Sequence, residues 1–137
     1  MTLNAVSLSL TLLAVAILTA CGGGGGGLSV PPERKWYVGG TLHEKSALEW
    51  QEADHADKLA TCADFVAKLW KMRGFKARIQ DSITSMDDLK PYAEKLVTFL
   101  DAATEKHPDE ARNRKMYVNQ TVAAMATAGL ITLGWAK

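Results

Sequence analysis

The sequence predicts an all-α domain, and three observations support this fold class. Apolar residues recur at helical spacing along residues 46–73. Capping patterns stand before two expected helices, at Ser46-x-x-Glu49 and at Ser85-Met86-Asp87-Asp88. Pro108 marks a helix end, because the residue before a proline is pushed out of the helical region. We expect a small three-helix domain over residues 33–137, with an extended N-terminal arm and helices at about 46–73, 86–106 and 109–135.

The first expected helix is amphipathic. Acidic residues and lysines lie between its apolar positions and form the solvated face. Gly74 is expected to end it in a left-handed conformation. Thr41-x-x-Glu44 fits a second capping box just upstream. The apolar positions are Trp50, Ala53, Ala56, Leu59, Ala60, Cys62, Ala63, Val66, Leu69 and Trp70.

The segment from Phe75 to Thr84 has a short period-two pattern, but a lone strand of this length is not stable by itself. We interpret it as an ordered connection that places Phe75 and Ile79 on the core. The second helix follows, with Pro91 tolerated in its first turn. Its apolar stripe is Leu89, Tyr92, Ala93, Leu96, Phe99, Leu100 and Ala103.

The third expected helix begins near Asp109 with a charged half. Its second half, Thr121 to Trp135, is apolar almost all round, which predicts a helix packed centrally between the others. The alternative is a membrane span from Met116 to Ala136. Asn119 and Gln120 reduce its apolar part below the roughly 20 residues that a span needs.

The first 32 residues differ in composition from the rest. Leu3 to Ala20 carries no charge, and its most apolar part has the length of a signal peptide's core. Gly22 to Gly27 and then Pro31-Pro32 are typical of a tether. We expect a signal peptide at 1–20, a Gly/Pro-rich tether at 21–32 and a domain at 33–137.

Leu18-Thr19-Ala20-Cys21 resembles the lipobox of bacterial lipoprotein precursors. That resemblance implies that Cys21 is lipidated and becomes the first residue of the mature chain, anchored to membrane lipid. Gly22 stands where an Asp would favour retention at the inner membrane, so the resemblance implies the periplasmic face of the outer membrane if the source is Gram-negative. No Lys or Arg precedes the apolar run, and the alternative is an uncleaved N-terminal anchor helix.

Charge and cysteine usage limit the function classes. The chain has 16 basic and 15 acidic residues, so no global charge favours nucleic acid as a partner. Lipidation of Cys21 would leave Cys62 as a single thiol. We expect Cys62 to be a small buried hydrophobe on a helix face.

One candidate contact site stands out after the first helix. The basic residues Lys68, Lys71, Arg73, Lys76 and Arg78 cluster in sequence there. Cations favour helix C-termini, which is the structural interpretation. The functional alternative is contact with an anionic lipid or polysaccharide.

The arm offers another alternative. Arg34-Lys35-Trp36-Tyr37 is either a segment that docks its aromatic side chains on the helical body or a basic-aromatic patch at the bilayer interface.

No motif predicts catalysis, a metal or a cofactor. His43, His55 and His107 are far apart in sequence and lack metal-site spacing, although His55 lies between Asp54 and Asp57. Cys62 and a distant histidine could form a nucleophile–base pair, but no spacing in the sequence supports one. The chain has no phosphate-binding loop with a lysine and no Gly-x-Ser-x-Gly elbow. We therefore expect no enzyme.

Two further resemblances bear on function. The mature part resembles small exported bacterial proteins of unknown function, through Tyr37, Gly39-Gly40-Thr41-Leu42, Trp50, Leu59-Ala60-Thr61, Asp64 and Gly134-Trp135. Thr61-Cys62-Ala63-Asp64-Phe65 resembles a segment of acid-stress chaperones, which pair this cysteine with a second one. The two hypotheses are a non-enzymatic envelope lipoprotein that binds an envelope protein or polymer, and a periplasmic chaperone-like stress protein.

Overall fold

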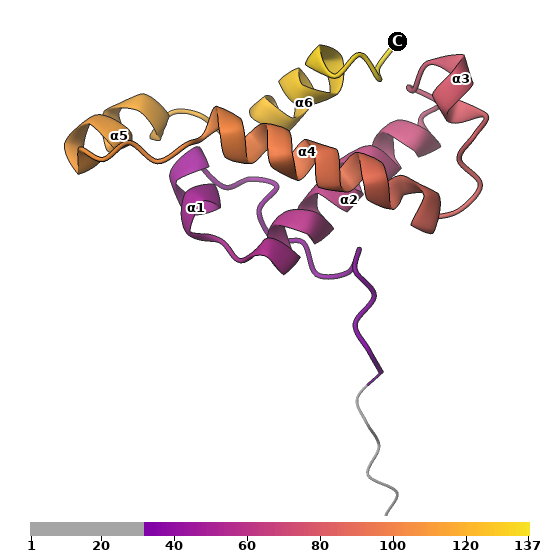
Figure 1. Ribbon diagram of the computed structural model, residues 1–137, viewed down its shortest axis with the longest axis horizontal. Coiled ribbons are helices and arrows are strands. Elements are labelled where there is room, and N and C mark those ends of the chain that lie inside the picture. The colour runs from indigo at the N-terminus through magenta and orange to yellow at the C-terminus, as the bar shows by residue number, and fades with distance from the viewer. Residues whose placement is uncertain (1–31) are drawn as a thin grey trace, which may run out of the picture. The chain divides into compact units, whose positions relative to one another are not determined.

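The computed structural model describes residues 32–137, and this body is all-α, as the sequence predicts (Figure 1). Its helices are α1 (Ala47–Glu52), α2 (His55–Lys71), α3 (Ala77–Gln80), the 3-10 helix η1 (Asp87–Leu89), α4 (Lys90–Ala103), α5 (Glu110–Tyr117) and α6 (Val122–Thr132). Within the body, β pairing is limited to two isolated bridges, Ser46–Thr121 and Phe75–Ala136. The expected signal peptide, most of the tether and Cys21 lie outside the described residues.

The expected helix over 46–73 is two helices. Ser46 caps α1 through the predicted capping box with Glu49. Ala53 is extended, and the carboxylate of Asp54 then accepts from the backbone N–H of Asp57 and starts α2. The helical spacing of apolar residues continues across this break, so the sequence pattern does not reveal the break.

The end of α2 also differs in detail from the prediction. Arg73, and not Gly74, adopts the left-handed conformation, with φ 53°. A side chain at Gly74 would still require a shift, because its Cβ would run into the Cδ1 atom of Leu69. The pattern Thr41-x-x-Glu44 caps no helix, since both the backbone N–H and the hydroxyl of Thr41 donate to Asp57 on α2.

The second helix agrees with the prediction apart from its ends. Asp88 accepts from the backbone N–H groups of Thr84 and Ser85, and η1 leads directly into α4. The connection from 75 to 84 contains the short helix α3. Phe75 is fully buried and Ile79 packs on the core, as expected.

The third expected helix is also broken. The chain leaves α5 at Val118, and the hydroxyl of Thr121 accepts from the backbone N–H of Ala124 to start α6. The range 116–136 therefore does not form one helix. Among the described helices, none is long and apolar enough to cross a membrane.

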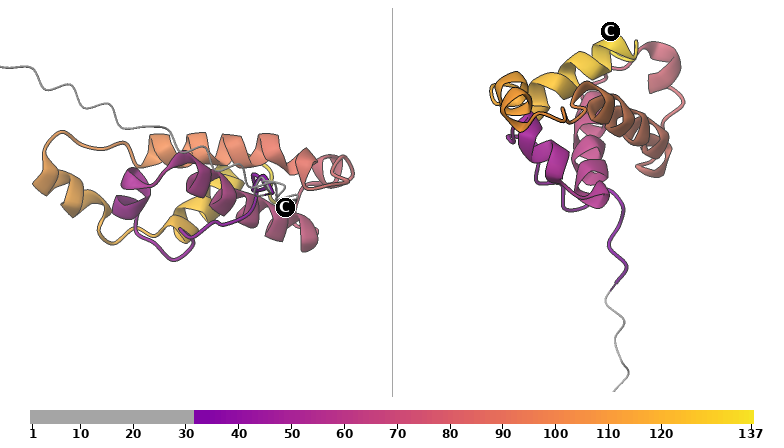
Figure 2. Two further views of the ribbon diagram at one scale, coloured as in Figure 1. Left: turned by 90° about the horizontal axis from the view of Figure 1, so that it is seen from below. Right: turned by 60° about the vertical axis from the view of Figure 1, so that its left-hand side comes forward.

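The centre of the body is α2 packed against α4, and the expectation of a central third helix is wrong. Cys62 and Val66 on α2, and Leu96 and Leu100 on α4, have 1% exposure or less. Helix α6 packs on α4 through Val122, Ala126 and Gly129, and its opposite side is exposed (Figure 2). The hydrophobic core that the structure describes lies between Leu42 and Trp135, so residues 32–137 form one compact unit with its own core.

The two ends of the body are tied down by different contacts. Near α5, Gln51 on α1 and Asn113 on α5 bond to each other through both amide groups, at 2.7 and 3.1 Å. At the other end, the backbone N–H of Lys76 donates to the carbonyl of Trp135 at 2.8 Å, which places the C-terminus beside α3 (Figure 1).

Candidate functional site

The candidate site is a groove between α2 and α6. Both helices pack on α4, and a trough of about 650 Å³ remains between them. We call it the α2–α6 groove. It is lined by His43, Glu44, Asp64, Phe65, Lys68, Leu69, Met72, Ala123, Thr127 and Leu130.

The two walls of the groove follow from helix periodicity. Phe65 and Leu69 on α2, and Met72 at its C-cap, occupy positions i, i+4 and i+7 and therefore share one face. Ala123, Thr127 and Leu130 have the same spacing on α6. One wall carries large apolar side chains and the other carries mostly small ones. This difference in size leaves the trough open.

The arm forms one end of the groove. The ring of His43 lies at 2.9 Å from Asp64 through its Nε2, and at 5.4 Å between centroids from the ring of Phe65. The backbone of Lys45 accepts from the N–H of Val122, which ties the arm to the first residue of α6. The arm thus bridges the two walls.

The docking of the arm confirms one sequence expectation. Trp36 and Tyr37 pack on the core, and the indole N–H of Trp36 donates to Asp87 at 3.0 Å. The close approach happens at Gly40, beside the backbone of Thr61 on α2. The hydroxyl of Thr61 then accepts from the N–H of Leu42 at 3.2 Å.

A second hollow, of about 390 Å³, lies between the arm and the first turn of α2. Of the two carboxylates that line it, Asp54 accepts from the backbone N–H of Asp57, and Asp57 accepts from Thr41 and Thr61. Burial raises the pKa of Asp57, but these hydrogen bonds outweigh it, and the net pKa lies below its ordinary value. Structural contacts therefore already use this carboxylate, and the α2–α6 groove is the better candidate site.

Two other carboxylates, Glu49 and Asp88, also have structural roles near helix starts. The backbone N–H of Ser46, with Lys45 and the Ser46 hydroxyl, lowers the pKa of Glu49 to about 2. The backbone N–H of Thr84 and nearby hydroxyls lower that of Asp88 to about 2. Glu49 belongs to the capping box of α1, and Asp88 holds the turn that precedes η1. Their shifted pKa values do not point to catalysis.

The structure does not bring Cys62, His55 and His107 together in one site. Cys62 is fully buried, and burial, with Asp101 nearby, raises the pKa of its thiol. His107 accepts from the N–H of Asp109 through Nδ1, and His55 is the exposed first residue of α2. Within residues 32–137, no three His, Cys, Asp or Glu side chains gather as a metal site would require.

The predicted basic residues stand at the end of the groove away from the arm. Lys68 lines the groove itself. Lys71 ends α2, Arg73 follows it, and Lys76 and Arg78 belong to the cap and first turn of α3. All five side chains are exposed. The lipidation site Cys21 lies outside the described residues.

Sequence reasoning missed the groove. Its walls come from α2 and α6, and no pattern in the sequence indicates that these two helices are neighbours. They lie together because both pack on α4. The one available hint was α6, whose apolar residues continue around the helix although a single face is buried. No family model, no curated protein and no solved structure matches this chain.

Proposed function

We propose that the chain is a lipid-anchored protein of the cell envelope, whose helical body is a non-enzymatic binding module. The anchor is Cys21 of the lipobox-like sequence, and the tether from Gly22 to Pro32 links it to the body. Two or more acyl chains would hold it durably at the membrane.

The observation that supports a binding role is the α2–α6 groove. Its surface is mainly apolar, although Asp64, Lys68 and Thr127 also line its walls, and it opens to solvent. Such a trough fits the apolar face of a peptide segment or helix from an envelope protein. Two of the polar residues that line it, His43 and Asp64, bond to each other and fix the arm.

The chaperone alternative is less well supported. Its resemblance depends on a cysteine that pairs with another one, and the thiol of Cys62 is enclosed in the core between α2 and α4. A pairing partner could not reach it without opening the body.

A neutral apolar dye tests the groove directly. Nile red, whose fluorescence rises in an apolar site, should bind residues 32–137. Ala123→Leu should fill the groove and reduce binding at least tenfold. Ala124→Leu is the matched control, since Ala124 is an exposed neighbour on the same helix and does not line the groove.

Equal loss in the two variants would contradict the groove as the binding site, and so would equal retention. Circular dichroism of both proteins should show unchanged helix content, so that a change in dye binding reports on the groove.

A further inference from the structure

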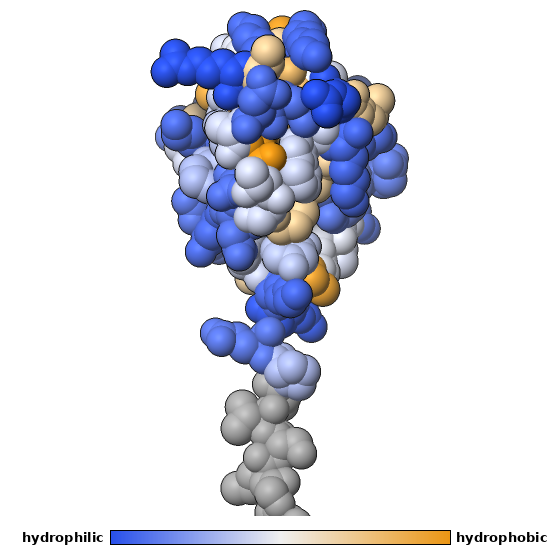
Figure 3. All heavy atoms as spheres, turned by 90° about the vertical axis from the view of Figure 1, so that its right-hand side faces the viewer, coloured by the Kyte–Doolittle hydropathy of each residue, from blue (hydrophilic) through white to orange (hydrophobic). Residues whose placement is uncertain are grey.

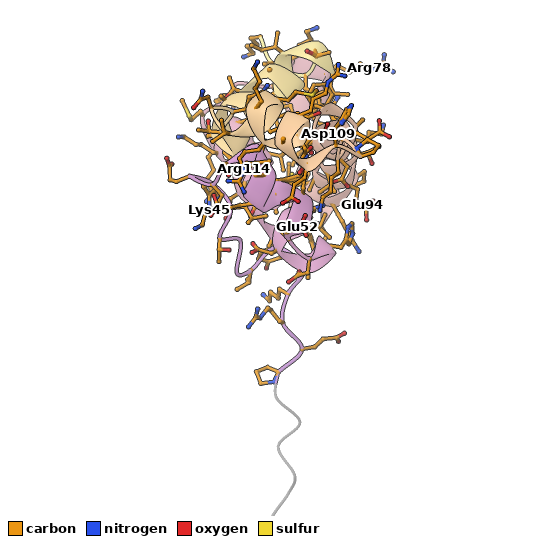
Figure 4. The ribbon with its side chains drawn as sticks, turned by 90° about the vertical axis from the view of Figure 1, so that its left-hand side faces the viewer. Lys45, Glu52, Arg78, Glu94, Asp109 and Arg114 are labelled. Carbon is orange, nitrogen blue, oxygen red and sulfur yellow. The ribbon has the colours of Figure 1, made fainter. Side chains whose placement is uncertain are left out.

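The end of the body where α2, α3 and the C-terminus meet carries a concentration of positive charge. We call it the basic end, made of Lys68, Lys71, Arg73, Lys76 and Arg78. Arg78 is well apart from Lys45 and Glu52 at α1 (Figure 4). The ion pairs found within residues 32–137 do not include any of these five side chains. The protein as a whole is nearly neutral, with a net charge of +1, so the clustering is local.

Helix electrostatics explains only part of this cluster. Lys68 and Lys71 lie in the last turn of α2, where the macrodipole favours cations. Lys76 is instead the N-cap residue of α3, where a cation is disfavoured. Helix electrostatics therefore accounts for Lys68 and Lys71 but not for Lys76, and the exposed cluster is available to an external anion.

Exposed hydrophobic side chains accompany the charges. Met72 is 71% exposed and Ile131 is 65% exposed, more than the other large hydrophobic residues of the body that are exposed. Met72 stands between Lys71 and Arg73 in the chain. Figure 3 faces this end and shows strongly hydrophilic side chains at the top of the body with hydrophobic ones among them.

The C-terminal segment after α6, residues 133–137, holds Ile131 at the same end of the body. The N–H of Lys137 donates to the carbonyl of Gly74 at 2.9 Å, and Phe75 pairs with Ala136. These contacts hold the last turn of α6 beside the end of α2. Positive charge and exposed apolar side chains thus come from three elements that the fold joins here.

We propose that the basic end rests on an anionic phospholipid surface. The cations meet headgroup phosphates, and Met72 and Ile131 enter the boundary between headgroups and acyl chains. An acidic polysaccharide would satisfy the charges but would leave both hydrophobic side chains in water. This proposal rests on the proposed function, because a lipid-anchored body is already close to the membrane. The contact itself depends on residues other than Cys21.

This contact would orient the groove. Helices α2 and α6 both run from the arm toward the basic end, since the arm bonds to Val122 at the start of α6 and Lys76 bonds to Trp135 after its end. The α2–α6 groove would then rise from the bilayer, with Met72 at its membrane end and His43 farthest away. A partner would be gripped close to the membrane surface.

Vesicle co-sedimentation of residues 32–137 tests the proposal without the lipid anchor. We expect binding to vesicles that contain about one-third phosphatidylglycerol, weaker binding at high salt, and none to pure phosphatidylcholine. Each cation lost should weaken binding about fivefold, so Lys71→Gln with Arg78→Gln should cost about 25-fold. The matched control is Arg112→Gln with Lys115→Gln, two exposed cations on α5 at the other end of the body, which should change binding less than twofold.

The hydrophobic part of the contact has its own test. Met72→Ser with Ile131→Ser should reduce vesicle binding at least tenfold and leave binding to dextran sulfate, a polyanion without an apolar phase, unchanged. Equal losses in the two charge pairs, binding to neutral vesicles, or indifference to the Met72 and Ile131 changes would overturn the proposal. None of these results depends on Cys21, so failure here is distinct from failure of lipid anchoring.

Discussion

Gly40 lies against the backbone of Thr61, so closely that a Cβ on Gly40 would come within 2.5 Å of the Thr61 nitrogen. This contact holds the arm on α2, and the arm in turn closes one end of the α2–α6 groove. A side chain at position 40 would push the two backbones apart.

Gly40→Ala should therefore destabilise the body by about 2 kcal/mol or more, because neither backbone can yield by rotating a side chain. Gly134→Ala is the comparison: its φ of 71° disfavours a side chain, but a Cβ there would meet only the flexible end of Lys76 at 3.6 Å. That change should cost only about 1 kcal/mol. Urea denaturation of both proteins measures the difference, and equal costs would contradict the close approach.

The second prediction concerns the starts of α2 and α6, which the sequence pattern does not indicate. Asp54→Ala and Thr121→Ala should each cost about 1 kcal/mol, because each removes the acceptor for an otherwise unpaired N–H at a helix start. The exposed Asp81, at the end of α3, is the control, and Asp81→Ala should change the free energy of unfolding by less than about 0.5 kcal/mol. If the caps are as tolerant as Asp81, α1–α2 or α5–α6 is a continuous helix after all.

These breaks show where sequence patterns stop being informative. The capping box at Ser46 and Glu49 is recognisable in the sequence because it precedes the apolar spacing. Asp54 and Thr121 are not recognisable as caps, because the apolar spacing continues on both sides of them and each resembles one more polar position. Local chemistry predicted the fold class and the burial of Cys62. It did not predict that α4 is shared by α2 and α6, and the groove depends on that packing.

Cys62 should react slowly with thiol reagents in the native body. Burial raises the pKa of its thiol, so little thiolate is present and none of it is accessible. Cys62→Ala should cost about 1 kcal/mol and leave dye binding in the groove unchanged. Labelling is followed with and without urea. Fast labelling of the folded protein would contradict the core assignment and favour a redox role.

The free energy of unfolding should fall in acid as Glu49 and Asp88 become protonated. The pKa values of Glu49 and Asp88 are about 2 in the folded body, below their ordinary values of 4.5 and 3.8. Both groups bind a proton more weakly when folded, so their contribution is complete above pH 4.5 and is lost as the pH falls toward 2. Urea midpoints should agree at pH 7 and pH 5 and decrease at pH 3.

Glu49→Gln should flatten that acid dependence, whereas Glu44→Gln, which removes a carboxylate that caps no helix, should preserve it. A midpoint that rises on acidification would contradict the assignment of these carboxylates. It would also favour the chaperone alternative, in which acid is the working condition.

Metabolic labelling with a fatty acid tests lipid anchoring at Cys21. Cells expressing the full chain or Cys21→Ser are labelled, fractionated and washed in high salt, which removes a body held only by its basic end. We predict label on the wild-type chain in the membrane fraction. The Cys21→Ser chain should carry no label, and its body should keep its helical circular dichroism. Label that persists on the Cys21→Ser chain, or a wild-type chain that takes up none, would contradict lipid attachment at Cys21.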